Sequence, residues 1–310
     1  MIVLVAWFIA CALVLVVAGT ALTRAADVIA ERTGLGRVFV GALLLAGATS
    51  LPELSTDIAA VRIGAPNLAV GDLFGSSIAN MLILALLTLM SPRRELMRRA
   101  SASHRLGGVL AIVLTLTAAG LVALGTTATI VGVNPGTIVL LVVFLGGTWM
   151  TYRRSLDDAS TAKALSAEPV AVQAPTLGRA TMMFGVAVVA ILLVAPEFAE
   201  IATQLADRSG LGRTFVGTWL LGVTTSMPEL VSGIAAVRMR AYDLAVANVF
   251  GSNAFNMTVF IALDLVHPGE SIFAALSPVH VLTALVAVAL MAIAIAILPR
   301  RPSRESPSPG

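Results

Sequence analysis

Two Pro-Glu pairs, Pro52-Glu53 and Pro228-Glu229, stand inside long apolar stretches of the sequence. Each glutamate follows a threonine and a serine, four and three residues earlier, so three side-chain oxygens fall on one face of a helix. A charged carboxylate in the middle of a membrane helix costs at least about 2.5–3.5 kcal/mol and rarely stands there without a function. The structural alternative is a protonated carboxyl that hydrogen-bonds within a helix bundle, and the duplicated hydroxyls argue against it.

The two pairs belong to an internal duplication. Residues 46–81 and 222–257 align without a gap at a constant offset of 176, and the match begins upstream, where GLGRVFVG at 34–41 faces GLGRTFVG at 210–217. More than half of the positions between 33 and 81 are identical to their partners. Such self-similarity indicates two copies of one structural unit.

Together the two copies offer two carboxylates, six hydroxyls and two amide oxygens. A set of oxygens without His or Cys suits hard cations, and Ca²⁺ takes about 6–8 oxygen ligands. Two negative charges balance one Ca²⁺ or two monovalent ions. The candidate metal ligands are Thr49, Ser50, Glu53, Ser76, Asn80, Thr225, Ser226, Glu229, Ser252 and Asn256.

The composition is that of a polytopic membrane protein, with a mean hydropathy of +0.95, 58% apolar residues and 12% charged residues. A spanning helix needs roughly 20 apolar residues. We expect an all-α protein whose spans are 2–23, 37–61, 67–90, 106–124, 135–152, 180–204, 213–237, 243–264 and 278–298.

The basic residues collect in alternate loops, which favours an N-terminus outside and a C-terminus inside, in a plasma or inner membrane. An odd number of spans in the first unit inverts the second, as in many secondary transporters. We expect the second unit to consist of four spans, without a counterpart of the fifth. The expected division is 1–152 for the first repeat, 153–178 for a cytoplasmic linker, 179–299 for the second repeat and 300–310 for a polar tail.

Several functional classes have no support in the sequence. The single Cys11 excludes an intrachain disulfide, the three histidines show no ligand spacing, and no residues suggest an enzyme or a cofactor. Nothing favours nucleic-acid binding, and no protein partner can be inferred. The expected partners are inorganic cations and membrane lipid.

The motifs GATSLPEL with GSSIANM, and GVTTSMPEL with GSNAFNM, resemble the two alpha-repeats of the sodium/calcium exchanger family, in its prokaryotic form without a large regulatory loop. The resemblance implies exchange of Na⁺ for Ca²⁺ by alternating access. It also implies that the ten oxygen-bearing residues bind the ions, that carbonyls near Ala46 and Gly222 assist, and that the first and sixth helices move.

Three features depart from the family pattern. Asn256 stands where some members, including the potassium-dependent branch, carry an acid, and the family's usual tenth helix is absent. The first copy has Asp72 and Ser77 where the second keeps Asn248 and Asn253. Asp72, one turn before Ser76, and Asp57, one turn after Glu53, are candidate accessory ligands without acidic partners in the second copy.

Three other functions remain open at this stage. A Ca²⁺/H⁺ exchanger would use the same glutamates to carry protons, and other divalent ions could replace Ca²⁺. A channel would conduct Ca²⁺ without a counter-ion, and a transport-dead sensor would bind ions without flux. Stoichiometry, direction of transport and oligomeric state are not fixed by the sequence.

Overall fold

The computed structural model describes residues 2–101, 103–130, 132–165, 175–209, 225–267 and 271–298. Within these ranges the regular secondary structure is helical, apart from an isolated bridge between Ile130 and Val133. The helices are α1 (Ile2–Thr33), α2 (Arg37–Val40), the π-helix η1 (Gly41–Leu45), α3 (Ala46–Arg62), α4 (Pro66–Met90), α5 (Glu95–Arg99), α6 (His104–Leu124), α7 (Pro135–Leu165), α8 (Leu177–Ser209), α10 (Met227–Arg238), α11 (Tyr242–Val266) and α12 (Val279–Ile297), with 3₁₀ turns at Pro92–Arg94 and Ile272–Ala275.

Eight helical segments of the described chain are long and apolar enough to cross a membrane, with α2, η1 and α3 counted as one. The all-α membrane fold is thereby confirmed. The predicted span 213–237 lies partly outside the described residues, and only its second half is present, as α10. Helices also extend into the predicted linker from both sides, since α7 continues to Leu165 and α8 begins at Leu177.

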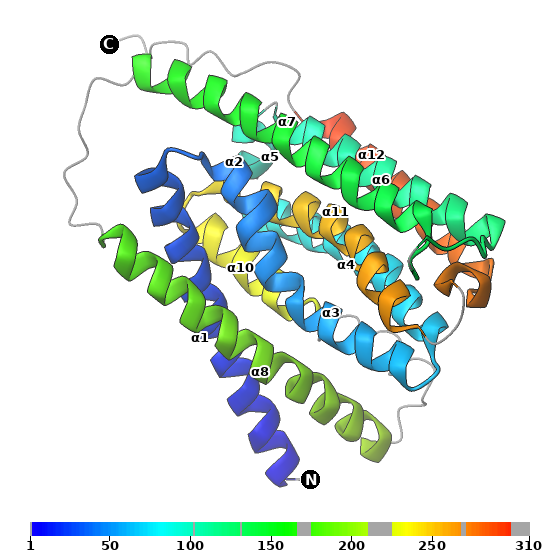
Figure 1. Cartoon of the computed structure of the whole chain (residues 1–310). Coiled ribbons are helices and arrows are strands. Elements are labelled where there is room, and N and C mark those ends of the chain that lie inside the picture. Colours follow the sequence, from blue (N-terminus) through cyan, green and yellow to red (C-terminus); the bar gives the residue numbers. More distant parts are fainter. Residues whose placement is uncertain are drawn as a thin grey trace.

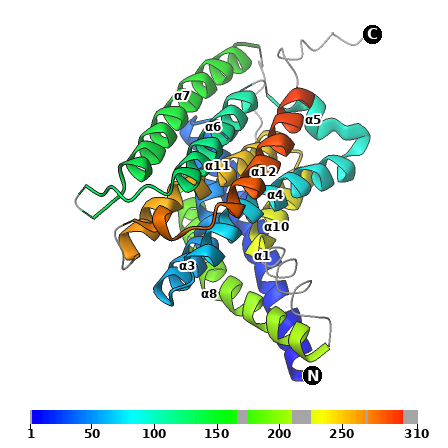
Figure 2. The same cartoon turned by 90° about the vertical axis from the view of Figure 1, so that its right-hand side faces the viewer.

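The helices form a central group with an outer group on each side (Figure 1). Helices α3, α4, α10 and α11 lie in the middle, α1 and α8 pack against each other on one flank, and α6, α7 and α12 lie on the other. The view turned by 90° shows the same arrangement (Figure 2). Helix α11 is the most enclosed, with 72% of its apolar window buried, against 22% for α1 and α12. The four central helices are those that carry the duplicated motif.

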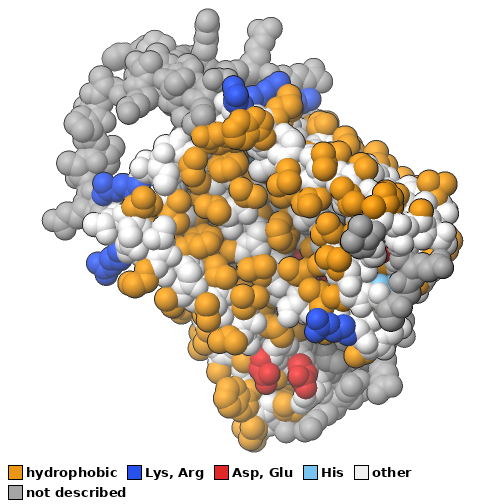
Figure 3. Space-filling view, viewed as in Figure 1, with side chains coloured by type: hydrophobic (Ala, Val, Ile, Leu, Met, Phe, Trp, Pro, Cys, Tyr) orange, Lys and Arg blue, Asp and Glu red, His pale blue; other side chains and the backbone are white. Residues whose placement is uncertain are grey.

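The outer helices present apolar side chains outward. Hydrophobic side chains cover most of the described part of the face in Figure 3, and the few charged side chains lie mostly toward its ends. The exposed residues include Trp7, Val17, Val142 and Leu193, from α1, α7 and α8. An apolar surface of this extent is stable in lipid and not in water.

The first Pro-Glu span is irregular in two places. The first irregularity is the π-helix η1, which follows α2, and the second is Pro52, which lies inside α3. A proline in a helix removes one backbone hydrogen bond, and π-helical turns are frequent at functional sites. In the second copy Pro228 lies in the first turn of α10, where a proline costs little. The residues before Thr225 lie outside the described part.

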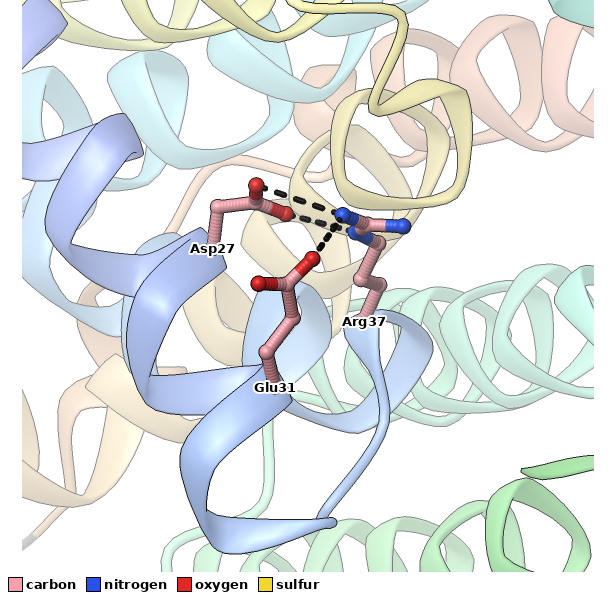
Figure 4. Close-up of polar contacts among 3 residues, drawn as sticks. All are labelled: Asp27, Glu31 and Arg37. Carbon is pink, nitrogen blue, oxygen red and sulfur yellow. Dashed lines mark hydrogen bonds and ion pairs between the residues drawn. The ribbon is translucent and has the colours of Figure 1, made fainter. Parts of the chain in front are cut away.

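An ion-pair cluster joins this span to the first helix (Figure 4). The Arg37 guanidinium donates to both carboxylate oxygens of Asp27, at 2.5 and 3.3 Å, and to Glu31 Oε1 at 2.7 Å. Gly34 and Gly36, with φ of 72° and 81°, make the turn between α1 and α2. The cluster therefore fixes where the span starts relative to α1.

The structural duplication extends beyond the motif, to a serine and a histidine that contact the first turns of α11 and α4 in both copies. Asp243 Oδ1 accepts the backbone N–H of Ser101 at 2.8 Å and lies 2.8 Å from His104 Nε2. The same contacts recur at an offset of 176, where Asn67 Oδ1 accepts the N–H of Ser277 at 2.7 Å and lies 3.1 Å from His280 Nε2. The histidines, which showed no ligand spacing, thus hold the first turns of two central helices.

Close packing of backbones brings the first Pro-Glu span against α11. A β-carbon at Gly251 would lie 2.5 Å from the carbonyl oxygen of Ala42, and one at Gly41 would lie 2.7 Å from the β-carbon of Ala247. Small residues allow membrane helices to approach this closely. Because Gly251 directly precedes Ser252, this contact sets the position of a candidate ligand.

We expect Gly251→Ala to destabilise the protein, because its methyl group would collide with backbone atoms that cannot rotate away. Over-packing of this kind costs about 1–3 kcal/mol. Thermal unfolding of the detergent-solubilised protein measures the effect as a lower midpoint. Gly146→Ala is the matched control, because a β-carbon there meets nothing within 4 Å. Equal midpoints for the two variants would contradict the packing argument.

Candidate cation-binding site

Four helices carry the candidate site, and its ten predicted side chains are all buried. Helix α3 supplies Glu53 with its hydroxyl neighbours, α10 supplies Glu229, whose hydroxyl neighbours directly precede that helix, and α4 and α11 supply the other serines and the asparagines. No side chain of the set is more than 3% exposed, and both glutamates are fully buried. Burial of so many polar groups among apolar helices is costly unless they bond to one another or to a ligand.

The two halves exchange hydrogen bonds at the glutamates. Ser50 Oγ donates to Glu229 Oε1 at 3.2 Å, and Ser226 Oγ donates to Glu53 Oε1 at 3.4 Å. Each bond links one repeat to the other, and the two bonds are equivalent under the offset of 176. The serine three residues before each glutamate therefore serves the opposite glutamate, so neither repeat completes the site alone.

The asparagines break this symmetry. Asn256 Nδ2 donates to Glu53 Oε2 at 3.1 Å, so both oxygens of Glu53 are bonded. Its counterpart Asn80 donates instead to Asn253 Oδ1 at 2.9 Å, and Glu229 Oε2 has no hydrogen-bond partner. Glu229 thus keeps a free carboxylate oxygen that Glu53 lacks.

The threonines and backbone carbonyls contribute unequally. The hydroxyl of Thr49 donates to the carbonyl of Ala46 at 3.1 Å and lies 3.5 Å from Asn248 Oδ1. The Ala46 carbonyl therefore already accepts one hydrogen bond, with a second lone pair remaining. Thr225 is buried near the start of α10, and Gly222, the other predicted carbonyl, lies outside the described residues.

Buried oxygens without partners concentrate on the central helices. A buried polar group left without a hydrogen bond costs about 1–3 kcal/mol, so a cluster of such groups indicates a ligand. Among the described residues, no three acidic, His or Cys side chains lie close enough together to hold a metal ion. A cation at this site would therefore depend mainly on hydroxyl and amide oxygens. The unpartnered oxygens are Asp57 Oδ2, Asp72 Oδ2, Ser76 Oγ, Asn80 Oδ1, Glu229 Oε2, Ser232 Oγ, Ser252 Oγ and Asn256 Oδ1.

Asp57 and Asp72 belong to this neighbourhood. Asp57 is 1% exposed, and one oxygen of each aspartate is buried without a partner. Asp72 is close enough to interact electrostatically with Asp57 and with both glutamates. The first repeat thus adds two carboxylates beside the symmetric pair.

In the second repeat, the side chain of Leu87 occupies the space that the equivalent of Asp57 would take. A β-carbon at Gly233 would lie 2.5 Å from Leu87 Cδ1, so no larger side chain fits without displacing Leu87. The acidic extension is therefore confined to one side of the site. Leu87 lies against position 233, where the other copy has Asp57.

Two further residues position the site. Asn253 accepts from Asn80 and donates to the carbonyl of Ser77 at 3.3 Å, so it joins α4 to α11. Asn248 lies against Thr49. In the sequence, both asparagines stand out only because the first copy has different residues at the same positions. Their alignment with Ser77 and Asp72, inside the motif, was the signal that pointed to them.

Comparison with known proteins agrees with this architecture. A family model described as sodium/calcium exchanger protein matches residues 3–152 and 179–307. The inner membrane protein YrbG of Escherichia coli is 27% identical over 271 residues, which are 83% of this chain and 78% of that protein. The sodium/calcium exchanger MaX1 of Methanosarcina acetivorans is 37% identical over 75 residues, 24% of this chain and 21% of that one.

The fold is also that of a solved transporter. The structure of the sodium-calcium exchanger NCX_Mj, soaked with Na⁺ and Sr²⁺, superposes with a TM-score of 0.67 at 23% sequence identity, and the match covers 96% of this chain and 99% of the other. With a family model that spans both repeats and a shared fold, the chain belongs to the sodium/calcium exchanger family.

Proposed function

We propose that this protein exchanges Ca²⁺ for Na⁺ across the membrane at one central site, by alternating access. The observation that carries the proposal is the pair of crossed serine–glutamate bonds, from Ser50 to Glu229 and from Ser226 to Glu53. They support a single site shared by both repeats. The family supports the coarser activity, antiport of Ca²⁺ against another cation.

In this proposal Glu53 and Glu229 supply the charge that the cations neutralise. Two carboxylates match one Ca²⁺ or two Na⁺, and an empty charged site is costly to enclose in a low-dielectric interior. The protein would therefore change its access only when the site is loaded. The neutral ligands would be Thr49, Ser50, Ser76, Asn80, Thr225, Ser226, Ser252 and Asn256.

The moving part we propose is the pair α1 and α8, the first and sixth spans. They pack most extensively against each other, and they meet the site helices mainly at two interfaces, α1 with α10 and α8 with α3. A pair of helices that carries none of the ten ligands can move without breaking the site. Movement of the pair relative to α3 and α10 would open the site to one side at a time.

Asp57 and Asp72 would extend the site on one side only. They add two carboxylates that interact electrostatically with the glutamates, beyond the two that balance a single Ca²⁺. We propose that they attract divalent ions from the outer side, where an N-terminus-outside arrangement puts the end of α3. Gly233 and Asn248 leave the inner side without this charge.

The same excess of carboxylates favours one rival function, a Ca²⁺/H⁺ exchanger. Each aspartate keeps a buried oxygen without a hydrogen-bond partner, and a proton can bind there. In that case protons rather than Na⁺ would neutralise the acids on the return step. The two functions use the same residues and differ in the coupling ion.

A flux measurement in proteoliposomes distinguishes the coupling ions. We expect ⁴⁵Ca²⁺ uptake to follow an imposed Na⁺ gradient and to be nearly indifferent to a pH gradient. Uptake driven by pH alone would replace Na⁺ by H⁺ in the proposal. Ca²⁺ conduction without any counter-ion would indicate a channel, and Ca²⁺ binding without flux would indicate a sensor.

The glutamates can be tested one at a time. We expect Glu53→Gln and Glu229→Gln each to reduce Ca²⁺ uptake at least about 100-fold, because the loss of one charge from a buried site costs about 3 kcal/mol or more. Glu200→Gln, on the exposed face of α8, is the control and should transport normally. Intact flux in both site variants would show that the site has been misassigned.

The aspartates should affect apparent affinity more than maximal rate. Asp72→Asn gives the first repeat the residue of the second, and we expect it to raise the KM for Ca²⁺ by about tenfold, for an attraction of roughly 1–2 kcal/mol. Asp57→Asn should act in the same direction. An unchanged KM in both variants would remove the aspartates from the proposed ion path.

A further inference from the structure

A groove of about 260 Å³ runs between α1 and α10, on the outside of the helix group. Gly19 and Thr23 hold the helices together beside it: a β-carbon at Gly19 would touch Val231 at 2.8 Å, and the Thr23 hydroxyl lies 3.3 Å from the carbonyl of Ser232.

The groove changes character along its length. Val16, Thr20 and Arg24 follow one face of α1 at intervals of four residues, and Val231, Ile234 and Arg238 follow one face of α10. The apolar side chains therefore line one part of the groove, and two arginines line the other. The arginines occupy the end at which α1 leads to α2.

Both arginines are exposed and have no ion pair with any described side chain. Arg37, which lies on the neighbouring α2, shows the contrast because Asp27 and Glu31 neutralise it. Two guanidinium groups on one groove without a carboxylate form a local excess of positive charge. Such a group of charges attracts an anion.

The other repeat does not reproduce this charge. At the offset of 176, Glu200 corresponds to Arg24, and Arg62 corresponds to Arg238. The equivalent positions on α8 and α3 thus carry one acid and one base, with no net charge. The double arginine is a property of one side of the molecule rather than a consequence of the duplication.

We propose that this groove binds a phospholipid with an anionic headgroup from the cytoplasmic leaflet. The headgroup phosphate would lie between Arg24 and Arg238, and an acyl chain would run along Val16, Val231 and Ile234. Basic pockets between membrane helices on the cytoplasmic side suit anionic headgroups, and the expected topology puts this end inside. The groove contains none of the ten candidate ligands, and its binding of lipid does not depend on which cations are exchanged.

Native mass spectrometry of the detergent-purified full chain tests the proposal. The protein is mixed with equimolar phosphatidylglycerol and phosphatidylcholine that carry the same acyl chains. We expect preferential retention of phosphatidylglycerol, and about a fivefold loss of its binding for each arginine in the series Arg24→Gln, Arg238→Gln and the double variant. Lysine at both positions should largely restore the preference, because it keeps the charge.

The matched control is Arg62→Gln with Arg179→Gln, which removes two exposed arginines elsewhere. It should keep the wild-type preference. An undiminished preference in the Arg24→Gln, Arg238→Gln variant overturns the proposal, and so does an equal loss in the control. Glycerol phosphate, the headgroup chemistry without acyl chains, should not compete; efficient competition would show a simple anion site rather than a lipid site.

Discussion

The crossed hydrogen bonds between Ser50 and Glu229 and between Ser226 and Glu53 are the contact on which the rest of the structure depends. Two fully buried carboxylates in an apolar helix bundle repel each other and lose their hydration, which is costly for each of them. Every hydroxyl or amide that donates to them offsets part of this cost. The donors come from the opposite repeat, so the two halves have to assemble before either glutamate is stabilised.

Around this contact, small residues and side-chain hydrogen bonds keep neighbouring helices close together. Gly251 and Gly41 let α11 approach the first Pro-Glu span until backbone atoms touch, and Asn253 joins α11 to α4. The histidine contacts of Asp243 and Asn67 hold the first turns of α11 and α4. These contacts lie outside the ligand set, yet they fix the separation of its members, and a cation site tolerates little error in ligand distance.

The two repeats differ chemically at a few positions in and around the candidate site. Asn256 satisfies Glu53, whereas Asn80 turns to Asn253 and leaves Glu229 with an unpartnered oxygen. Asp57 and Asp72 add charge on one side, and Leu87 fills the space beside Gly233 on the other. Arg24 and Arg238 make the membrane surface asymmetric as well.

The sequence alone determined the class of protein and most of its membrane-spanning helices, and it predicted the ten residues of the candidate site. Apolar stretches long enough to span a bilayer, together with a gap-free repeat around Pro52-Glu53 and Pro228-Glu229, suffice for this, because both signals are local along the chain. The part of the seventh span before Thr225 lies outside the described residues. The tertiary structure decided which serine donates to which glutamate, that Asn256 but not Asn80 donates to a glutamate, and that Leu87 lies against Gly233. Those outcomes depend on distances between helices far apart in sequence, and a residue pattern carries no information about the side chain that faces it.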